Sequence, residues 1–267
     1  MMELDHRPIP TIIPVMDEFL LSDHFYLVLS APFVGSFLGV VITRADSELS
    51  ALGGHSSCPR CSHPLRWRDR VPIVSWMANH AKCSYCRGSL SVFYPAIELA
   101  ALAIAIWCLI LVPGALAWVG CIYGWTLLAL AGIDLRSFRL PYRITLPLAS
   151  VGLLVQSLIG LANLLDGLLG MTIGSSLFIL IAWAYRRLRG RDGLGEGDVG
   201  LLAAIGAWVG WQGIPAVILI AGLSGLAWVC IHALLRRPLG RTEWLPFGPH
   251  LCLGGWITWL YGPIQLG

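Results

Sequence analysis

The stretch GLGEGDVGLLAAIGAWVGW, Gly193 to Trp211, joins a glycine-rich segment to an apolar run, with Asp198 at the junction. Alternating glycines occur in loops that bind dinucleotides, but such a loop follows a buried strand. Here the polar segment YRRLRGRD precedes the glycines, and the chain has no GKS or GKT for a P-loop. We expect a tight turn whose glycines allow positive φ and close backbone approach, and which delivers Asp198 to the start of a membrane helix. A flexible loop with Asp198 as a simple helix cap is the open alternative.

The composition of the chain identifies the environment of that helix. Of 267 residues, 57% are hydrophobic and 12% are charged, whereas soluble domains carry about 25% charged residues. Mean hydropathy is +0.74, which indicates an integral membrane protein. The net charge of +3 gives no reason to expect a nucleic-acid partner. The N-terminus does not resemble a signal peptide, because Pro8, Pro10 and Pro14 interrupt any apolar core after Arg7.

Apolar runs predict an all-α polytopic membrane protein with about eight transmembrane helices. The runs lie at roughly 25–42, 93–112, 115–133, 144–161, 168–184, 199–210, 214–232 and 249–264. Most approach the roughly 20 residues that a bilayer requires, but the sixth is short and is either a half-span or continues through Trp211. We divide the chain into a periplasmic segment at 1–24, a first transmembrane helix at 25–42, a loop domain at 43–92 and a helical transmembrane domain at 93–267.

The distribution of basic residues predicts the orientation of these helices. With the N-terminus outside, the inner loops hold seven Lys and Arg between Arg44 and Arg87, three in 136–143, four in 186–191 and three in 236–241. That leaves only Arg7 of 18 basic residues outside. Because basic loops stay in the cytoplasm during insertion, we expect a multi-pass protein of the bacterial inner membrane with the 43–92 loop on the cytoplasmic face.

The long loop contains two CxxC pairs, Cys58–Cys61 and Cys83–Cys86. Four thiolates in two such pairs suit tetrahedral zinc, and a complete set of four leaves no open position for catalysis. A reducing cytoplasm disfavours disulfides, and a loop this short needs metal binding to supply folding free energy. We therefore expect a structural zinc site; incidental thiols or a redox pair are the alternatives.

Four acids lie inside or at the ends of predicted spans, where a charge is costly: Glu98, Asp134, Glu196 and Asp198. Asp134 and Asp198 each stand at the cytoplasmic end of a helix with arginines nearby, so the topology places them at the same depth. Two close carboxylates share a proton, which allows one to activate water while the other protonates a carbonyl. The simpler alternatives are that Asp198 only interacts favourably with a helix dipole and that Asp134 only reaches toward water.

Five motifs resemble those of the type IV prepilin peptidases, which are bifunctional leader peptidases and N-methyltransferases related to GxGD membrane aspartic proteases. The motifs are GSFLGVVITR, the paired CxxC loop, FYPAIEL, IDLRSFRLPYRITLPL and the GLGEGD stretch, and PFGPHLCLGG from Pro246 to Gly255 adds a further likeness. The resemblance covers nearly the whole chain. It implies an aspartic peptidase domain at 93–267, with Asp134 and Asp198 as the catalytic aspartates.

The resemblance also implies substrates, cofactors and location. The substrates would be type IV prepilins or type II secretion pseudopilins, cleaved after a Gly that ends a short basic leader at the cytoplasmic membrane face. S-adenosylmethionine would then methylate the new N-terminus, with Glu98 as the candidate residue for the methyl donor. Cys58, Cys61, Cys83 and Cys86 would hold the zinc, and lipid would surround the helices.

Four residues depart from the family pattern: Gly39 replaces Asn, Leu102 replaces Gly, Tyr142 replaces Asp or Asn, and Gly200 replaces Lys. Both aspartates remain, so these changes bear on methyl transfer and substrate choice more than on cleavage.

Two functions from other classes stay open. A proton-coupled transporter would place its acids near mid-membrane and often shows inverted repeats, and a catalytically silent secretion scaffold would keep only the zinc loop.

Overall fold

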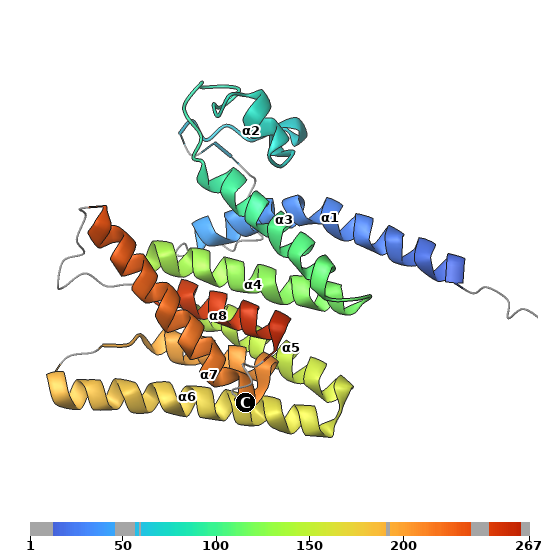
Figure 1. Cartoon of the computed structure of the whole chain (residues 1–267). Helices are drawn as coiled ribbons and strands as arrows, with labels where there is room; N and C mark the ends of the chain where they lie inside the picture. The colour runs from blue at the N-terminus through green and yellow to red at the C-terminus, as the bar shows by residue number, and fades with distance from the viewer. Residues whose placement is uncertain (1–12, 46–56, 59, 191–192, 236–245, 263–267) are drawn as a thin grey trace, which may run out of the picture.

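The structure of the protein, a computed structural model, describes residues 13–45, 57–58, 60–190, 193–235 and 246–262 (Figure 1). All of its regular elements are helical, with isolated bridges as the only β pairing in the described residues. In chain order they are α1 (Ile13–Arg44), η1 (Trp67–Arg70), α2 (Val74–Ala78), α3 (Phe93–Leu111), α4 (Leu116–Ser137), α5 (Tyr142–Ile159), α6 (Leu161–Arg189), α7 (Glu196–Leu234) and α8 (Gly248–Tyr261). The all-α prediction is therefore confirmed.

Each predicted transmembrane run overlaps one of these helices over most of its length, although 144–161 runs past the end of α5 at Ile159 and 249–264 runs past the end of α8 at Tyr261. Six helices of the described chain are long and apolar enough to cross a membrane: α1 from Phe25, α3, α4, α5, α6 and α7. The helix α8 has 14 residues, and α7 contains two of the predicted runs, 199–210 and 214–232. The first helix begins before the predicted 25–42, because residues 13–24 continue it; residues 1–12 lie outside the described part.

The helix α7 is two limbs that reverse direction at Gly210, whose φ of 70° and ψ of 175° are not helical. One residue from each limb lies near the start of α8. On the second limb, Ser224 Oγ is 3.0 Å from His250 Nδ1 of α8. On the first limb, Asp198 interacts electrostatically with Asp134, whose carboxylate accepts a hydrogen bond from Gly248 of α8. An unbroken helix would hold residues 198 and 224 about 39 Å apart. The short sixth run therefore forms the first limb of a hairpin.

Polar side chains compensate the backbone at this reversal. Gln156 Nε2 donates to the Trp208 carbonyl at 2.8 Å, and Trp211 Nε1 donates to Asp166 Oδ1 at 3.2 Å. Within a membrane, a backbone carbonyl freed by a break needs a partner such as the Gln156 amide, whereas the Trp211–Asp166 bond joins two side chains and ties α7 to α6. Acid and amide side chains from α5 and α6 thus stabilise a break that the glycine makes possible.

Glycines allow the helices to pack closely around the hairpin. A Cβ on Gly170 of α6 would meet the Gly206 carbonyl oxygen of α7, and a Cβ on Gly174 would lie 3.2 Å from both Leu202 and Ile214, one on each limb. Membrane helices associate through small residues because lipid offers little hydrophobic driving force. The helix α6 therefore packs along both limbs of α7.

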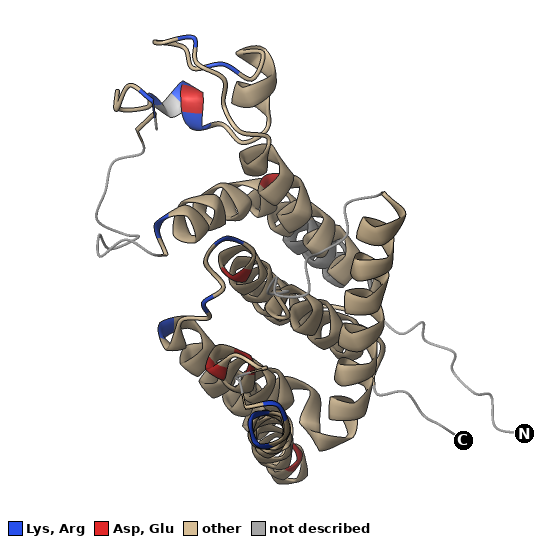
Figure 2. Cartoon of the chain, turned by 90° about the vertical axis from the view of Figure 1, so that its left-hand side faces the viewer, with Lys and Arg blue, Asp and Glu red and all other residues tan. Residues whose placement is uncertain are grey.

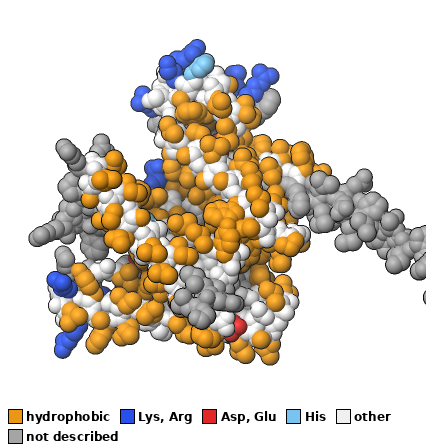
Figure 3. Space-filling view, viewed as in Figure 1, with side chains coloured by type: hydrophobic (Ala, Val, Ile, Leu, Met, Phe, Trp, Pro, Cys, Tyr) orange, Lys and Arg blue, Asp and Glu red, His pale blue; other side chains and the backbone are white. Residues whose placement is uncertain are grey.

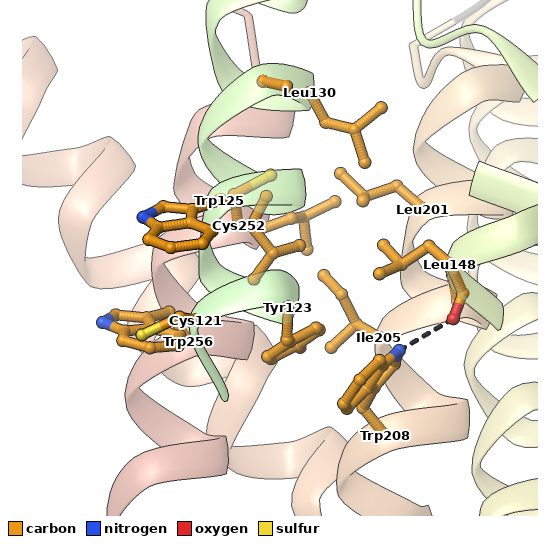
Figure 4. Close-up of a cluster of buried hydrophobic side chains, with 14 of the residues drawn as sticks. Cys121, Tyr123, Trp125, Leu130, Leu148, Leu201, Ile205, Trp208, Cys252 and Trp256 are labelled. Carbon is orange, nitrogen blue, oxygen red and sulfur yellow. Dashed lines mark hydrogen bonds between the residues drawn. The ribbon is translucent and has the colours of Figure 1, made fainter. Parts of the chain in front are cut away.

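An aromatic cluster joins α4, α7 and α8 (Figure 4). Tyr123 stacks on Trp208 with ring centroids 4.4 Å apart, and Trp208 Nε1 donates to the Leu148 carbonyl of α5 at 2.8 Å. The Trp256 ring lies 6.3 Å from that of Tyr123. These contacts fix the register of α4 against α7 and α8. They therefore also fix the relative positions of Asp134, Asp198 and Gly248, which lie a few turns away along the same helices.

The loop between α1 and α3 forms a small unit over the ends of these two helices (Figures 1 and 3). Basic side chains gather on it, and an apolar surface covers the helices below. Figure 2 faces the end of the bundle at which α4 stops and α7 starts. The basic residues Arg44, Arg136, Arg139, Arg143 and Arg186 stand at helix ends or turns on this side.

Candidate active site

Asp134 lies in the last turn of α4 and is 5% exposed. The helix ends because Phe138 adopts the left-handed conformation, with φ of 54°, and donates its N–H to the Asp134 carbonyl at 2.9 Å. The chain then turns through Leu140 and Pro141 into α5. This turn makes one wall of a cavity and keeps the carboxylate at the end of the bundle.

Asp198 is the third residue of α7, and its N–H donates to the Gly195 carbonyl at 3.1 Å. The three glycines before it leave room for neighbouring groups. A Cβ on Gly193 would collide with the Tyr185 ring, one on Gly195 would lie 3.3 Å from Asp198 Oδ2, and one on Gly197 would lie 2.9 Å from Leu140 Cβ. None of them has positive φ, so the expectation based on φ was wrong, and close approach is the reason for the glycines.

One cavity of about 460 Å³ joins the two aspartates. Side chains from the end of α1, the end of α4, the following turn and the start of α7 line it: Ala45, Ile133, Asp134, Phe138, Arg139, Leu140, Pro141, Tyr142, Glu196 and Asp198. Asp134 and Asp198 are close enough to repel each other electrostatically. Residues that are 64 positions apart in sequence thus meet at one end of the bundle, as predicted from topology.

A third element holds Asp134 in place. The backbone N–H of Gly248, the first residue of α8, donates to Asp134 Oδ2 at 3.0 Å. A Cβ at this position would lie 2.7 Å from the same oxygen. The PFGPHLCLGG stretch contains this glycine, but its sequence alone gave Gly248 no role, although glycine is the residue that allows close backbone approach.

Two departures from the family pattern lie against each other beside this cavity. A Cβ on Gly200 would be 3.2 Å from the Tyr142 ring, and Tyr142 itself lines the cavity. The Tyr142 side chain therefore fills space next to residue 200, and a longer side chain there would displace it. Glu196, in the glycine loop, also lines the cavity and adds a third acid to it.

The four loop cysteines converge as a separate cluster. Their Sγ atoms all lie within 4.8 Å of one another, and those of Cys58 and Cys86 are 3.9 Å apart. Tetrahedral zinc with sulfur at about 2.3 Å requires sulfur–sulfur separations of about 3.8 Å, so the cluster could hold this metal. The loop carries two matching knuckles: Cys58 N–H donates to the His63 carbonyl at 3.0 Å, and Cys83 N–H to the Gly88 carbonyl at 2.8 Å.

The surroundings of the thiols also suit metal binding. Hydrogen bonds from the backbone N–H groups of Arg60 and Cys61 lower the pKa of Cys58 to about 7. The backbone N–H of His63 acts in the same direction on Cys61, but desolvation and the neighbouring Cys58 and Cys86 thiols raise the pKa of Cys61 to about 11. Thiols that disfavour each other's ionisation in this way would be relieved by a bound cation.

Glu98 does not join the aspartates. It is 6% exposed, lies in the second turn of α3, and accepts a hydrogen bond at 2.7 Å from the Ile73 N–H of the loop. It lines a second cavity, of about 710 Å³, between the loop and the helices α1 and α3. Among the described residues, Glu98 therefore lines a different cavity from the one that Asp134 and Asp198 line.

Two protein-family models match the chain. The bacterial peptidase A24 N-terminal domain matches residues 29–112, and the type IV leader peptidase family matches residues 121–230. The chain is similar to proteins named prepilin leader peptidase/N-methyltransferase. That of Aeromonas hydrophila is 39% identical, with 90% of this chain and 91% of the relative covered. That of Stutzerimonas stutzeri is 33% identical, with 92% and 94% covered, and that of Pseudomonas aeruginosa is 33% identical, with 88% and 89% covered.

No solved structure matches the chain. The two family matches together span both the loop unit with the cysteine cluster and the helices that carry the aspartates. The identity above 30% extends over most of each relative's length. The chain belongs to the type IV leader peptidase family.

Proposed function

We propose that the protein is a membrane aspartic endopeptidase that removes the leader from type IV prepilins or type II secretion pseudopilins. The observation that carries this proposal is the meeting of Asp134 and Asp198 in one cavity at the end of the bundle. Membership of the leader peptidase family supports it, as do relatives named prepilin leader peptidase/N-methyltransferase. Acids at one end of the bundle do not favour the transporter alternative, and an intact pair does not favour the scaffold.

The mechanism follows from the carboxylate pair. Two repelling carboxylates in a partly shielded cavity hold one proton between them. The ionised member takes a proton from water, whose oxygen attacks the scissile carbonyl carbon, and the protonated member gives its proton to the carbonyl oxygen. When the tetrahedral intermediate breaks, the aspartate that took the proton from water gives it to the nitrogen as the C–N bond cleaves, and the other aspartate recovers its proton from a hydroxyl of the intermediate. The Gly248 N–H keeps the Asp134 carboxylate oriented throughout.

The position of the cavity fits a substrate that is itself anchored in the membrane. The arginines at this end of the bundle support a cytoplasmic orientation, because cytoplasmic loops carry an excess of Lys and Arg. A substrate helix in the bilayer would then present its scissile bond where α4 ends and α7 begins. We propose the cytoplasmic face of the inner membrane as the place of cleavage after the leader's Gly.

The cysteine cluster is proposed to be a structural zinc site. Cys58, Cys61, Cys83 and Cys86 would supply four thiolate ligands and leave no open position for water. The described loop has only short helices, and metal binding would supply the folding free energy that so small a unit needs.

Methylation of the new N-terminus is the second part of the proposal. It is supported by the N-methyltransferase named in the relatives. When bound, S-adenosylmethionine supplies a methyl group to the new amine and leaves as S-adenosylhomocysteine. We propose Glu98 as a residue of the donor site, because it is a buried carboxylate beside a cavity that the aspartates do not line.

Co-expression with a prepilin tests the peptidase proposal. Wild type should remove the leader, whereas Asp134→Asn and Asp198→Asn should each abolish removal. Leader cleavage that survives both substitutions would eliminate the aspartic mechanism. Mass spectrometry of the mature N-terminus tests methylation separately, and an unmodified amine from an active enzyme would mean peptidase activity alone.

A further inference from the structure

Two further cysteines face each other near the turn that joins α3 to α4. Cys108 lies in the last turn of α3 and Cys121 in the second turn of α4, and both are fully buried. The helix α3 starts beside the loop unit and α4 ends near Asp134, so the turn between them lies at the opposite end of the bundle (Figure 1). The pair therefore belongs neither to the cysteine cluster nor to the aspartate cavity.

The contacts of Cys108 place its sulfur on the face of α4 that carries Cys121. Cys108 Sγ donates to the Ala117 carbonyl at 3.4 Å, and a Cβ on Gly120 would lie 2.6 Å from the same sulfur. Ala117, Gly120 and Cys121 share one face of α4, because residues three and four apart are neighbours on a helix. A helical side chain leans toward the N-terminus of its helix, so the Cys121 thiol points back toward the level of Ala117. The two thiols share a hydrogen bond there.

Small residues bring the two helices close together at this level. Gly120 leaves room on α4 for the Cys108 side chain, and one turn further along a Cβ on Gly124 would lie 2.8 Å from Ile104 Cγ2 of α3. Ala105, one turn before Cys108, is fully buried. Membrane helices that pack through small residues approach closely. An inter-helix disulfide requires such an approach, since its two Cα atoms usually lie about 4.4–6.8 Å apart.

The orientation proposed above places this pair on the periplasmic side of the membrane. The turn at 112–115, with the sequence VPGA, carries no basic residue, whereas the loop and the helix ends at the opposite side carry many. Disulfides form and persist in the periplasm, while thiols on the cytoplasmic side stay reduced. The same chain would therefore keep its cluster cysteines as thiolates for metal and expose its second pair of cysteines to oxidation.

We propose that Cys108 and Cys121 form a disulfide that joins the outer ends of α3 and α4. The inference rests on the membrane orientation given under the proposed function. The thiolate of one cysteine attacks the disulfide of a periplasmic thiol oxidase and forms a mixed disulfide, and the second cysteine then attacks this bond. The oxidase leaves as a dithiol that carries the two electrons and two protons. Both sulfurs are buried thiols in the folded structure, so the exchange takes place before the α3–α4 hairpin packs.

The disulfide would connect the two parts of the chain that separate family models match. Cys108 lies in the part matched at residues 29–112, and Cys121 is the first residue of the part matched at 121–230. The helix α3 continues directly from the loop unit, and α4 carries Asp134. A covalent link between them restricts the unfolded chain and stabilises the contact between the two parts.

Differential thiol labelling of the full wild-type chain in a bacterial inner membrane tests the disulfide. Membranes are denatured with a light maleimide, reduced, labelled with a heavy maleimide, and analysed by peptide mass spectrometry. Cys108 and Cys121 should carry the heavy label, whereas Cys230 and the buried Cys252 should carry the light label. Cys121→Ala should convert Cys108 to the light label. Reduction with a phosphine should lower the apparent Tm of wild type and leave that of Cys121→Ala unchanged.

Light label on both cysteines of wild type would overturn the disulfide. The labelling of wild type needs no variant, and Cys108→Ala replaces Cys121→Ala if the latter does not fold. In a host that lacks the periplasmic thiol oxidase, both cysteines should carry the light label, and heavy label there would overturn the exchange step. Leader cleavage is measured on the same membranes. Light label in a chain that cleaves leaders refutes the disulfide alone, and heavy label in a chain that does not cleave refutes the peptidase alone.

Discussion

Gly248 donates its backbone N–H to Asp134 Oδ2 at 3.0 Å, across 114 residues of sequence. The first turn of α8 therefore positions a carboxylate that is carried by α4. The contact is possible because residue 248 has no side chain, since a Cβ would lie 2.7 Å from the accepting oxygen and 2.9 Å from the carboxylate carbon. Orientation of the aspartate pair thus depends on a third helix from the end of the chain.

Substitution of Gly248 by Ala should impair cleavage without removing either aspartate. The added methyl group must push Asp134 or α8 out of position, and displacements of about 1 Å can cost roughly 100-fold in rate. We expect leader cleavage to slow by about 10- to 100-fold. The measurement is the initial rate of prepilin processing in detergent.

Gly222→Ala is the matched control for this change. A Cβ at Gly222, on the second limb of α7, meets no atom within 4 Å. That variant should cleave at the wild-type rate. Full activity of Gly248→Ala would show that the hydrogen bond and close contact do not matter for catalysis.

The sequence was sufficient to predict the meeting of the aspartates but not the contacts that hold them. Helix direction follows from apolar length and basic loops, and this placed Asp134 and Asp198 at the same end. Of the two reasons expected for the glycines before Asp198, positive φ was wrong, whereas close approach of neighbouring groups applies. Their φ values are ordinary, and the need for glycine comes from Leu140 and other distant side chains that no local pattern reveals.

The short apolar run at 199–210 is a second feature whose structure depends on distant residues and could not be predicted from the local sequence. Its length left a half-span or a continuation through Trp211 as alternatives, because hydropathy does not report a change of direction. The structure places a reversal at Gly210, supported by Gln156 and Asp166 from other helices. A lone glycine in an apolar run gives little signal when Gly206 and Gly213 stand near it in regular helix.

Gly210→Ala should destabilise the fold. Its φ of 70° with ψ of 175° belongs to a region that is essentially restricted to glycine, and forcing another residue into it costs about 1–3 kcal/mol. Apparent Tm in detergent, followed by tryptophan fluorescence, should fall below that of Gly222→Ala. Equal Tm values for the two variants would contradict a fixed reversal at this residue.

Removal of one cysteine ligand should release the metal. Metal analysis should give about one zinc per wild-type chain and much less in Cys58→Ser, because a tetrahedral structural site needs all four ligands. Cys230→Ser, which changes an exposed cysteine of α7 outside the cluster, should retain the metal. Equal zinc in both variants would contradict the assigned ligands.

Metal retention should also depend on pH in a defined direction. Without metal, backbone hydrogen bonds lower the pKa of Cys58 to about 7, whereas desolvation and the neighbouring thiols raise the pKa of Cys61 to about 11, so acidification protonates the cluster one thiolate after another. Because protons compete with metal for thiolates, zinc should be retained at mildly alkaline pH and released progressively as the pH falls. Dialysis against a weak chelator at graded pH, followed by metal analysis, measures this. Retention that is constant or improves on acidification would be inconsistent with thiolate ligation.

The contact between Gly200 and Tyr142 predicts that these two departures from the family pattern compensate each other. A Cβ at residue 200 would lie 3.2 Å from the Tyr142 ring, so Ala requires only a small shift of that exposed side chain, whereas Lys must displace it. Gly200→Lys alone should therefore reduce leader cleavage severalfold, since Tyr142 lines the aspartate cavity. Adding Tyr142→Asp should restore the rate, because the acid frees space and can pair with the lysine.

Initial cleavage rates of wild type, the two single variants and the double variant form a double-mutant cycle, in which residues in contact give non-additive effects. Additive losses would mean that the two positions act independently despite their contact.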